Sequence, residues 1–150
     1  MATVAQLSNE YLYQREQGLI DLLSDSLHII LMDDTFAFNP DTHKVLADVS
    51  AKELGTGHGY TQGGLVLQNV ILNRDTSSGN NKVWATMDDP VWTASGGNIG
   101  PTKAAIIYDA DALNAPIIGC IEFTAPYTIP DTASFQLRDV QIRSTGVINS

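Results

Sequence analysis

The first third of the chain carries a helical pattern of hydrophobic positions. Residues 7–23 place apolar side chains three or four positions apart, as on one face of an amphipathic helix. These side chains are Leu12, Leu19, Ile20 and Leu23. Ser8 can cap the first turn by accepting a hydrogen bond from a free backbone amide. Gly18 inside the stretch costs about 1 kcal/mol relative to alanine, so we expect this helix to depend on packing or on a partner.

From residue 27 onward the pattern predicts β-strands. Residues 27–32 form an apolar run that ends at Asp33 and Asp34, which predicts a buried strand. Residues 65–72 are apolar on both alternating faces, which predicts a central strand between two packed layers. Further strands are predicted at residues 82–87, 104–108, 117–123 and 135–142, with a short helical turn over 48–54 and a hairpin loop over 75–81.

The predicted strand over residues 135–142 changes its alternation phase halfway along. Phe135 and Leu137 share one phase, whereas Val140 and Ile142 share the other. A β-bulge near Arg138 would turn both apolar pairs toward one core; otherwise both faces of the strand are buried.

Short strands separated by Gly, Pro and Asx turns predict the fold class. We expect a mainly β protein, an antiparallel sandwich or barrel with a jelly roll as one form, preceded by an N-terminal α-helix. The predicted organisation is an N-terminal arm and helix over residues 1–26, then one β-rich unit over residues 27–150. A chain of 150 residues is long enough to bury a core without metal or disulfide support.

Charge and composition restrict the partners. The chain has 8 Lys and Arg against 17 Asp and Glu, a formal charge of -9, and its basic residues are scattered singly. Because nucleic-acid binding needs clustered basic side chains, we expect no nucleic-acid ligand. No apolar run approaches the roughly 20 residues of a membrane span, so we expect a soluble protein without a membrane partner. Cys120 is the single cysteine, which excludes an internal disulfide and fits folding in a reducing cytoplasm.

Three features superficially suggest nucleotide or metal chemistry. Residues 55–59 contain three alternating glycines, but a phosphate-binding loop follows a strand and opens a helix, whereas a β pattern follows here. His28, His43 and His58 lack the paired spacing of zinc ligands. We therefore predict a plain loop and structural histidines, with no cofactor.

The aspartate pairs are the best ionic candidates. They are Asp33 with Asp34, Asp88 with Asp89, and Asp109 with Asp111. Calcium binds several oxygen ligands brought together by loops, but none of the pairs has the spacing of an EF-hand, and aspartates also stabilise turns through backbone amides. Turn chemistry is our interpretation, with a weak calcium site as the alternative.

Other residue types could in principle serve catalysis or ligand binding. Asp88 and Glu122 are the acids that glycoside hydrolysis would use, but no cluster of aromatic residues accompanies them. Ser24, Ser50 and Ser95 lack the nucleophile-elbow pattern. Cys120, Trp84 and Trp92 are interpreted as core residues. We predict no catalytic, cofactor-binding or metal-binding residues, and no enzyme.

Several segments between residues 46 and 123 share a distinctive order. A Val-Ser-Ala segment at 49–51 and Gly-Tyr-Thr-x-Gly-Gly at 59–64 precede Trp-Thr-Ala-Ser-Gly-Gly at 92–97 and an apolar strand that ends at Tyr108 and Asp109. In this combination the chain resembles small virion structural proteins of tailed bacteriophages. The resemblance implies a structural component of the particle rather than an enzyme.

The resemblance implies a function and partners. We expect a capsid decoration, or cement, protein that binds the outer face of the shell and stabilises it. It would form a homo-oligomer, with a trimer favoured, contact the major capsid protein or other virion proteins, and reside in the virion after synthesis in the bacterial cytoplasm. A neck or tail connector or fibre-base component is the alternative. A carbohydrate-binding module is a third, and it would need exposed aromatics gathered on one face, such as Tyr11, Tyr13, Tyr60 and Tyr127.

Overall fold

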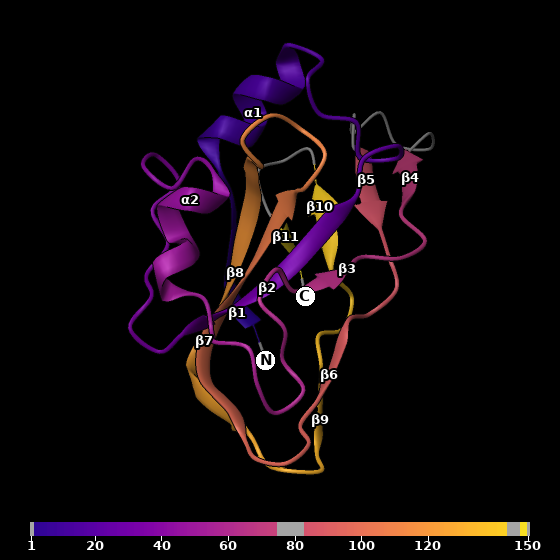
Figure 1. The fold of residues 1–150 in the computed structure, drawn as a ribbon. Helices are drawn as coiled ribbons and strands as arrows, with labels where there is room; N and C mark the ends of the chain where they lie inside the picture. The colour runs from indigo at the N-terminus through magenta and orange to yellow at the C-terminus, as the bar shows by residue number, and fades with distance from the viewer. Residues whose placement is uncertain (1, 75–82, 144–147, 150) are drawn as a thin grey trace.

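A five-stranded antiparallel sheet forms the centre of the fold (Figure 1). The computed structural model describes residues 2–74, 83–143 and 148–149. Within them the strand order of this sheet is β1-β8-β7-β2-β3. Its strands are β1 (Ala2–Leu7), β2 (Leu27–Asp33), β3 (Leu65–Val66), β7 (Ile99–Asp109) and β8 (Ile117–Ile129). The protein is therefore mainly β with antiparallel sheets, as the turn-rich pattern predicts.

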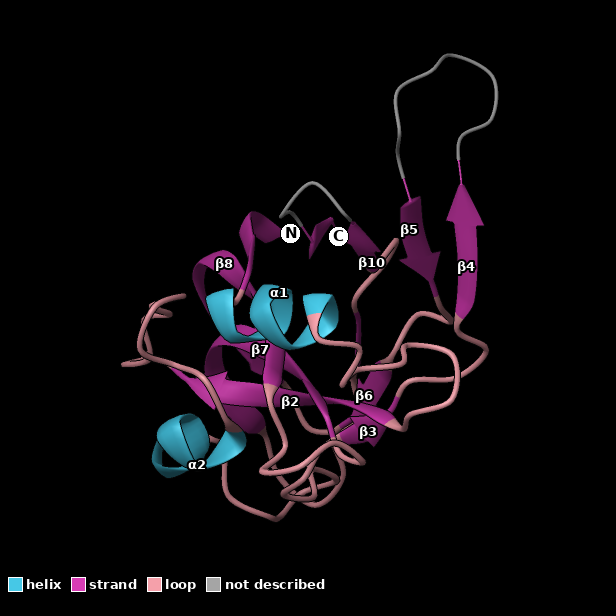
Figure 2. Cartoon of the chain, turned by 90° about the horizontal axis from the view of Figure 1, so that it is seen from above, coloured by secondary structure: helices cyan, strands magenta, loops and turns pink. Residues whose placement is uncertain are grey.

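Two smaller antiparallel sheets and short helices complete the architecture (Figures 1 and 2). The four-stranded sheet has the order β11-β10-β5-β4, formed by β4 (Ile71–Arg74), β5 (Val83–Thr86), β10 (Gln141–Arg143) and β11 (Ile148–Asn149). The two-stranded sheet pairs β6 (Val91–Thr93) with β9 (Ser134–Gln136). The helices are α1 (Asn9–Glu16), α2 (Leu46–Val49) and a 3₁₀ turn over Ser50–Lys52.

The five-stranded sheet buries both of its faces. On one face, Ile29, Ile107 and Ile121 join a cluster that reaches Trp92 and Phe135 of the two-stranded sheet. On the other face, a second cluster lies under α2 and the segment around it. Its buried members are Ile30, Met32, Phe36, Val49, Ala104, Ile106, Tyr108, Ile117 and Cys120. Burial on both faces explains why the central strands are apolar at successive positions rather than at alternate ones.

The N-terminal helix is shorter than the predicted helix over residues 7–23. Ser8 caps it as predicted, because its hydroxyl accepts a hydrogen bond from the Tyr11 amide at 3.0 Å. Gly18 lies outside the helix and ends it: its φ is +74°, and the amide of Leu19 donates to the Gln14 carbonyl at 3.0 Å. This is the glycine-dependent turn that commonly terminates helices. The predicted continuation of the helix over residues 19–23 is therefore wrong.

The first residues belong to the central sheet rather than to a separate arm over residues 1–26. β1 pairs along β8, from Ala2 opposite Phe123 to Leu7 opposite Gly119. Tyr11 is 2% exposed and lies in the same core cluster as the central strands. The sequence predicts no strand here, because β1 lies at the edge of the sheet and its apolar and polar residues alternate only weakly.

The predicted central strand over residues 65–72 is wrong. The segment forms β3, at the edge of the large sheet, and β4, at the edge of the four-stranded sheet. Asn69 between them has a φ of +55°, which breaks the extended conformation. Its apolar side chains are partly exposed, with Ile71 58% and Leu72 43% accessible.

The predicted strand over residues 135–142 is also divided between two sheets. β9 and β10 are separated by a break at which Asp139 has a φ of +56°, in place of the predicted bulge. The packing consequence is nevertheless as expected, because Phe135, Leu137, Val140 and Ile142 all lie in one core cluster.

The remaining predicted strands are confirmed, apart from their ends. Residues 27–32, 104–108 and 117–123 fall within β2, β7 and β8, and 82–87 contains β5. The predicted turn over 48–54 overlaps α2 and the 3₁₀ turn. β4 and β5 pair antiparallel, and the predicted loop over 75–81 between them lies outside the described residues.

Substitution of Gly64 tests how closely the chain before β3 approaches the neighbouring strand β2. Its φ is +77°, and a Cβ there would overlap the carbonyl group of Ile29. We expect Gly64→Ala to lower the free energy of unfolding by about 2 kcal/mol or more, because the strain and the overlap add. Urea unfolding monitored by tryptophan fluorescence measures the effect.

Gly55→Ala is the matched control. Gly55 lies in the same glycine-rich region, and an added Cβ meets no atom within 4 Å. Its unfolding free energy should stay within about 0.5 kcal/mol of the native value. Equal losses for the two variants would contradict the proposed close approach.

Candidate functional site

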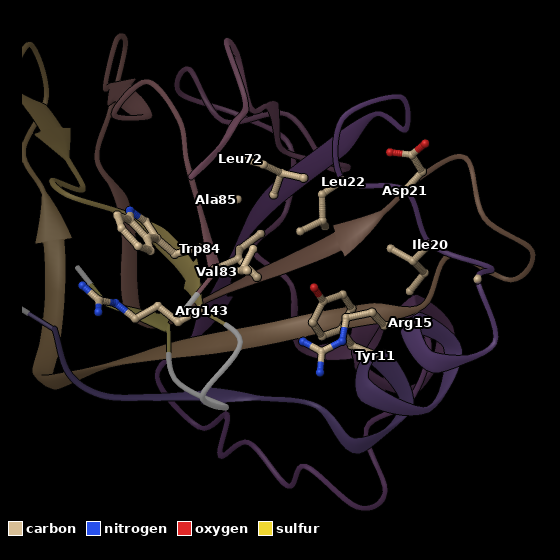
Figure 3. Close-up of a pocket in the computed structure, with 12 residues that line it drawn as sticks. Tyr11, Arg15, Ile20, Asp21, Leu22, Leu72, Val83, Trp84, Ala85 and Arg143 are labelled. Atoms are coloured by element: carbon tan, nitrogen blue, oxygen red, sulfur yellow. The ribbon is translucent and has the colours of Figure 1, made fainter. Parts of the chain in front are cut away.

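A cleft of about 350 Å³ lies between the segment that follows α1 and the β4–β5 hairpin (Figure 3). The N-terminal part of the chain contributes one wall, and the four-stranded sheet contributes the opposite wall. The lining residues include Tyr11, Arg15, Ile20, Asp21, Leu22, Leu72, Val83, Trp84, Ala85, Ile142 and Arg143. A cavity of this volume is at the lower end of the range for small-molecule or side-chain binding.

Local structure after α1 places the first wall. The turn at Gly18 reverses the chain, so that Ile20 and Leu22 face the cleft. The Asp21 carboxylate accepts hydrogen bonds from the amides of Leu23 and Ser24, at 3.0 and 3.2 Å. These backbone hydrogen bonds lower the pKa of Asp21, so the carboxylate stays ionised and holds the turn. Its oxygens point away from the cavity in Figure 3.

Two arginines, Arg15 and Arg143, line the cleft together with the Asp21 carboxylate. The Arg15 guanidinium lies over the Tyr11 ring, 5.4 Å from the centroid, and 3.6 Å from Glu16. Arg143 donates to the Gln141 side chain at 2.6 Å. Burial raises the pKa of Tyr11, and the neighbouring Arg15 partly opposes that effect. The cleft therefore combines an apolar lining with the Tyr11 hydroxyl and a few charged side chains.

A second, acidic groove of about 510 Å³ lies between residues 65–68 and 88–91. Its apolar lining comes mainly from Leu65, Val66 and Val91. The Asp88 carboxylate accepts from the Asn69 amide group at 2.6 Å, and Asp89 lies beside it. The groove thus combines apolar side chains with two acids.

Members of the predicted aspartate pairs accept hydrogen bonds from backbone amides, some within their own turn and some from distant segments. Asp33 accepts from the Thr35 amide at 2.9 Å, and Asp89 accepts from the Asp139 amide at 3.0 Å. Asp111 accepts from the Ser26 amide at 2.7 Å. Within the described ranges, no group of three or more His, Cys, Asp or Glu side chains is arranged to hold a metal ion.

The three histidines have separate structural surroundings. His28 lies 3.1 Å from the Gly63 carbonyl and beside the Tyr108 ring. His43 accepts from the Asn39 amide at 3.0 Å and stacks on Phe36. His58 lies in the glycine loop over residues 55–59, which packs against the backbone around Thr93 and leads into β3 rather than into a helix.

The buried cysteine and one tryptophan are core residues, as predicted. Cys120 is 1% exposed, and burial, with a smaller contribution from Glu122, raises the pKa of its thiol. Trp92 is 2% exposed within the larger cluster. Trp84 differs from the prediction, because it is half-buried and lines the cleft.

The structure does not gather the four tyrosines on one exposed face. Tyr11 and Tyr60 are both 2% exposed, and Tyr127 packs on Phe135 with 5.3 Å between ring centroids. Only Tyr13 among the four is strongly exposed, at 62%. These four tyrosines therefore do not form one exposed aromatic platform.

The residues considered for hydrolysis are similarly dispersed. Glu122 accepts from the Phe38 amide at 3.3 Å on the central sheet, whereas Asp88 lies in the groove beside β3. Ser50 bonds the Ala47 carbonyl at 3.5 Å, and Ser95 contacts the His58 region through a backbone hydrogen bond. These contacts are all explained by local structure.

A buried polar network that the sequence pattern did not reveal joins Tyr60 to the central sheet. The Tyr60 hydroxyl donates to Glu53 at 2.7 Å and accepts from the Leu31 amide at 3.0 Å. Glu53 also accepts from the Gly63 amide at 2.9 Å. Burial, and then the hydrogen bond to Glu53, raise the pKa of Tyr60. The network fixes the loop before β3 and hence one wall of the acidic groove.

Asp109 is a buried acid with an incomplete set of partners. Its Oδ1 accepts from the amides of Asp111 and Ala112, at 2.9 and 3.1 Å. Its Oδ2 is buried without a hydrogen-bond partner among the described residues. Burial and the nearby Asp25 carboxyl raise the pKa of Asp109 to about 7.

Comparisons with known proteins identify no relative. The chain matches no family model, no characterised protein and no solved structure. In the described part of the chain, no helix is both long and apolar enough to span a membrane. The functional interpretation therefore depends on the surface and charge of the molecule itself.

Asp109 generates a prediction about pH. The folded state retains a proton on this group up to about pH 7, whereas the unfolded chain releases it near pH 4. The contribution of Asp109 to stability should therefore fall as pH rises from about 4 to about 7. Asp109→Asn should unfold with a free energy about 2 kcal/mol higher than the native protein at pH 8, and the difference should vanish near pH 4.

Urea unfolding across this pH range measures the difference, and Asp111→Asn is the control. Asp111 is exposed in the same turn, so its neutralisation changes the same charge without relieving a buried carboxylate. We expect no stabilisation from the control at pH 8. Destabilisation by Asp109→Asn at every pH would contradict the assignment.

Proposed function

We propose that this chain is a virion structural protein, most specifically a capsid decoration protein that binds the outer face of the shell and stabilises it. One observation carries the proposal: large apolar side chains remain exposed together on one side of an otherwise well-buried β protein. Val66, Ile71, Leu72, Val83 and Val91 are each at least 43% exposed. They belong to β3, β4, β5 and β6, which lie on one side in both views (Figures 1 and 2).

An exposed apolar surface of this kind favours protein contact. Large apolar patches on soluble proteins usually mark interaction sites. The polar groups singled out from the sequence are occupied by turns, caps and buried networks, which is typical of a structural role. The resemblance of residues 46–123 to small phage virion proteins supports the same interpretation.

Charge supports a position on the outside of the shell. A net charge of -9 opposes contact with packaged nucleic acid. A rigid β core can instead present a fixed surface to other subunits. Binding that occurs only in the assembled state stabilises the particle by mass action.

Particle stability tests the decoration role. Particles of the parent virus that lack this chain should assemble but release their DNA at a lower temperature than native particles. The effect should be larger at low salt, where DNA self-repulsion is screened least. A DNA-binding dye during a thermal ramp measures release, and adding the purified chain back provides the control.

Copy number separates decoration from the neck or tail alternative. Decoration predicts hundreds of copies over the shell, whereas closed symmetry at one vertex limits a connector to about a dozen or fewer. Quantitative mass spectrometry and cryo-electron microscopy of purified particles give both number and position. Density confined to the tail vertex would overturn the decoration proposal.

A further inference from the structure

Both sheets end on the side of the molecule that carries the exposed apolar residues. β3 is the last strand of the five-stranded sheet, and β4 is the last strand of the four-stranded sheet. Their outer edges have no strand partner among the described residues. An open sheet edge bearing apolar side chains is a site at which another chain can add.

Most of the exposed large apolar side chains in the described residues gather there. Five of the nine lie on β3, β4, β5 and β6. Two others, Leu19 and Leu23, flank the segment whose Ile20 and Leu22 line the cleft. Figures 1 and 2 both place these elements on the side opposite α2. We call this side the β3–β6 face.

The two cavities of the β3–β6 face have complementary chemistry. The cleft between the post-α1 segment and the hairpin has a mainly apolar lining with two arginines, Arg15 and Arg143, and one acid, Asp21. The groove between β3 and β6 is apolar, with Asp88 and Asp89 and no basic side chain among its lining residues. The borders of the two cavities therefore carry apolar side chains with an excess of charge of opposite sign.

We propose that the β3–β6 face is the self-association surface of the protein, in which the exposed side chains that border the cleft of one copy dock against those that border the groove of the next. A second copy is the occupant because it supplies both the acidic-apolar and the basic-apolar partner. Two chains of charge -9 repel each other in general, so a contact between copies must place unlike charges together.

The geometry also determines the kind of assembly. Because the cleft and the groove are different surfaces, their contact is head-to-tail rather than the same patch on both copies. A head-to-tail contact produces a closed ring when the rotation from one copy to the next adds up to a full turn. The cleft and the groove lie on one side of the molecule, which suits a ring of few copies. The inference specifies the self-association within the proposed function and rests on that proposal only for its biological role.

Charge reversal tests the contact directly. Arg15→Glu changes the net charge from -9 to -11, and Asp88→Lys changes it from -9 to -7. We expect the native protein to sediment as a closed oligomer and each single variant to dissociate at a concentration about tenfold or more higher. If net charge alone controlled association, Asp88→Lys would associate more strongly than the native protein.

The double variant separates a lost contact from a lost fold. Arg15→Glu combined with Asp88→Lys restores the net charge of -9 and exchanges the two signs across the contact. It should recover the oligomer, whereas two unrelated folding defects would accumulate. Lys44→Glu is the control, because Lys44 precedes α2 on the opposite side and its reversal also gives -11. Circular dichroism and sedimentation velocity are measured for every variant.

The outcomes distinguish this inference from the proposed function. A native protein that is monomeric at micromolar concentration, or an oligomer that neither single reversal weakens, overturns the inference. Failure of the double variant to recover, although it folds, also overturns it. If the chain binds particles as a monomer, the β3–β6 face contacts the shell instead, and the decoration proposal stands without the ring.

Discussion

The fold depends on one constraint: the five-stranded sheet is apolar on both faces and must be covered on both. Ile29 and Ile30 are successive residues of β2, both fully buried, yet they belong to opposite core clusters. A sheet of this kind requires two additional layers to exclude water from it. The α2 region covers one face, and the smaller sheets, together with α1, contribute to the cluster on the other.

The covering layers are less regular than the sheet that they cover, and this difference produces the candidate sites. The strands β2 and β7 are long and lie in both core clusters, whereas β3 to β6 are short, and the connection between β3 and β4 contains the positive-φ residue Asn69. Short strands leave gaps between neighbouring elements. The cleft and the acidic groove lie at two such gaps, so the surface chemistry follows from how the second layer closes over the core.

The sequence predicts the central strands but not the covering layer, for a physical reason. Runs such as residues 27–32 and 117–123 are apolar at most successive positions and are short, which favours a doubly buried strand. Residues 65–72 look equally apolar, but they divide between two sheets because Asn69 between them adopts a left-handed backbone conformation. The end of α1 shows the same effect, since Gly18 stops a helix that the apolar spacing would otherwise continue.

The candidate sites were harder to predict because their residues are ordinary when taken singly. Arg15 and Arg143 are separated by almost the whole chain, and only the packing of α1 beside the four-stranded sheet brings both to the lining of one cleft. Asp88 and Asp89 form a recognisable pair, but no sequence pattern shows that they lie beside Val66 and Val91. Complementarity between two surfaces arises from tertiary structure, whereas motif analysis detects chemistry concentrated in one segment. A contact surface, unlike an active site, is therefore recognised mainly from the distribution of exposed apolar area and charge.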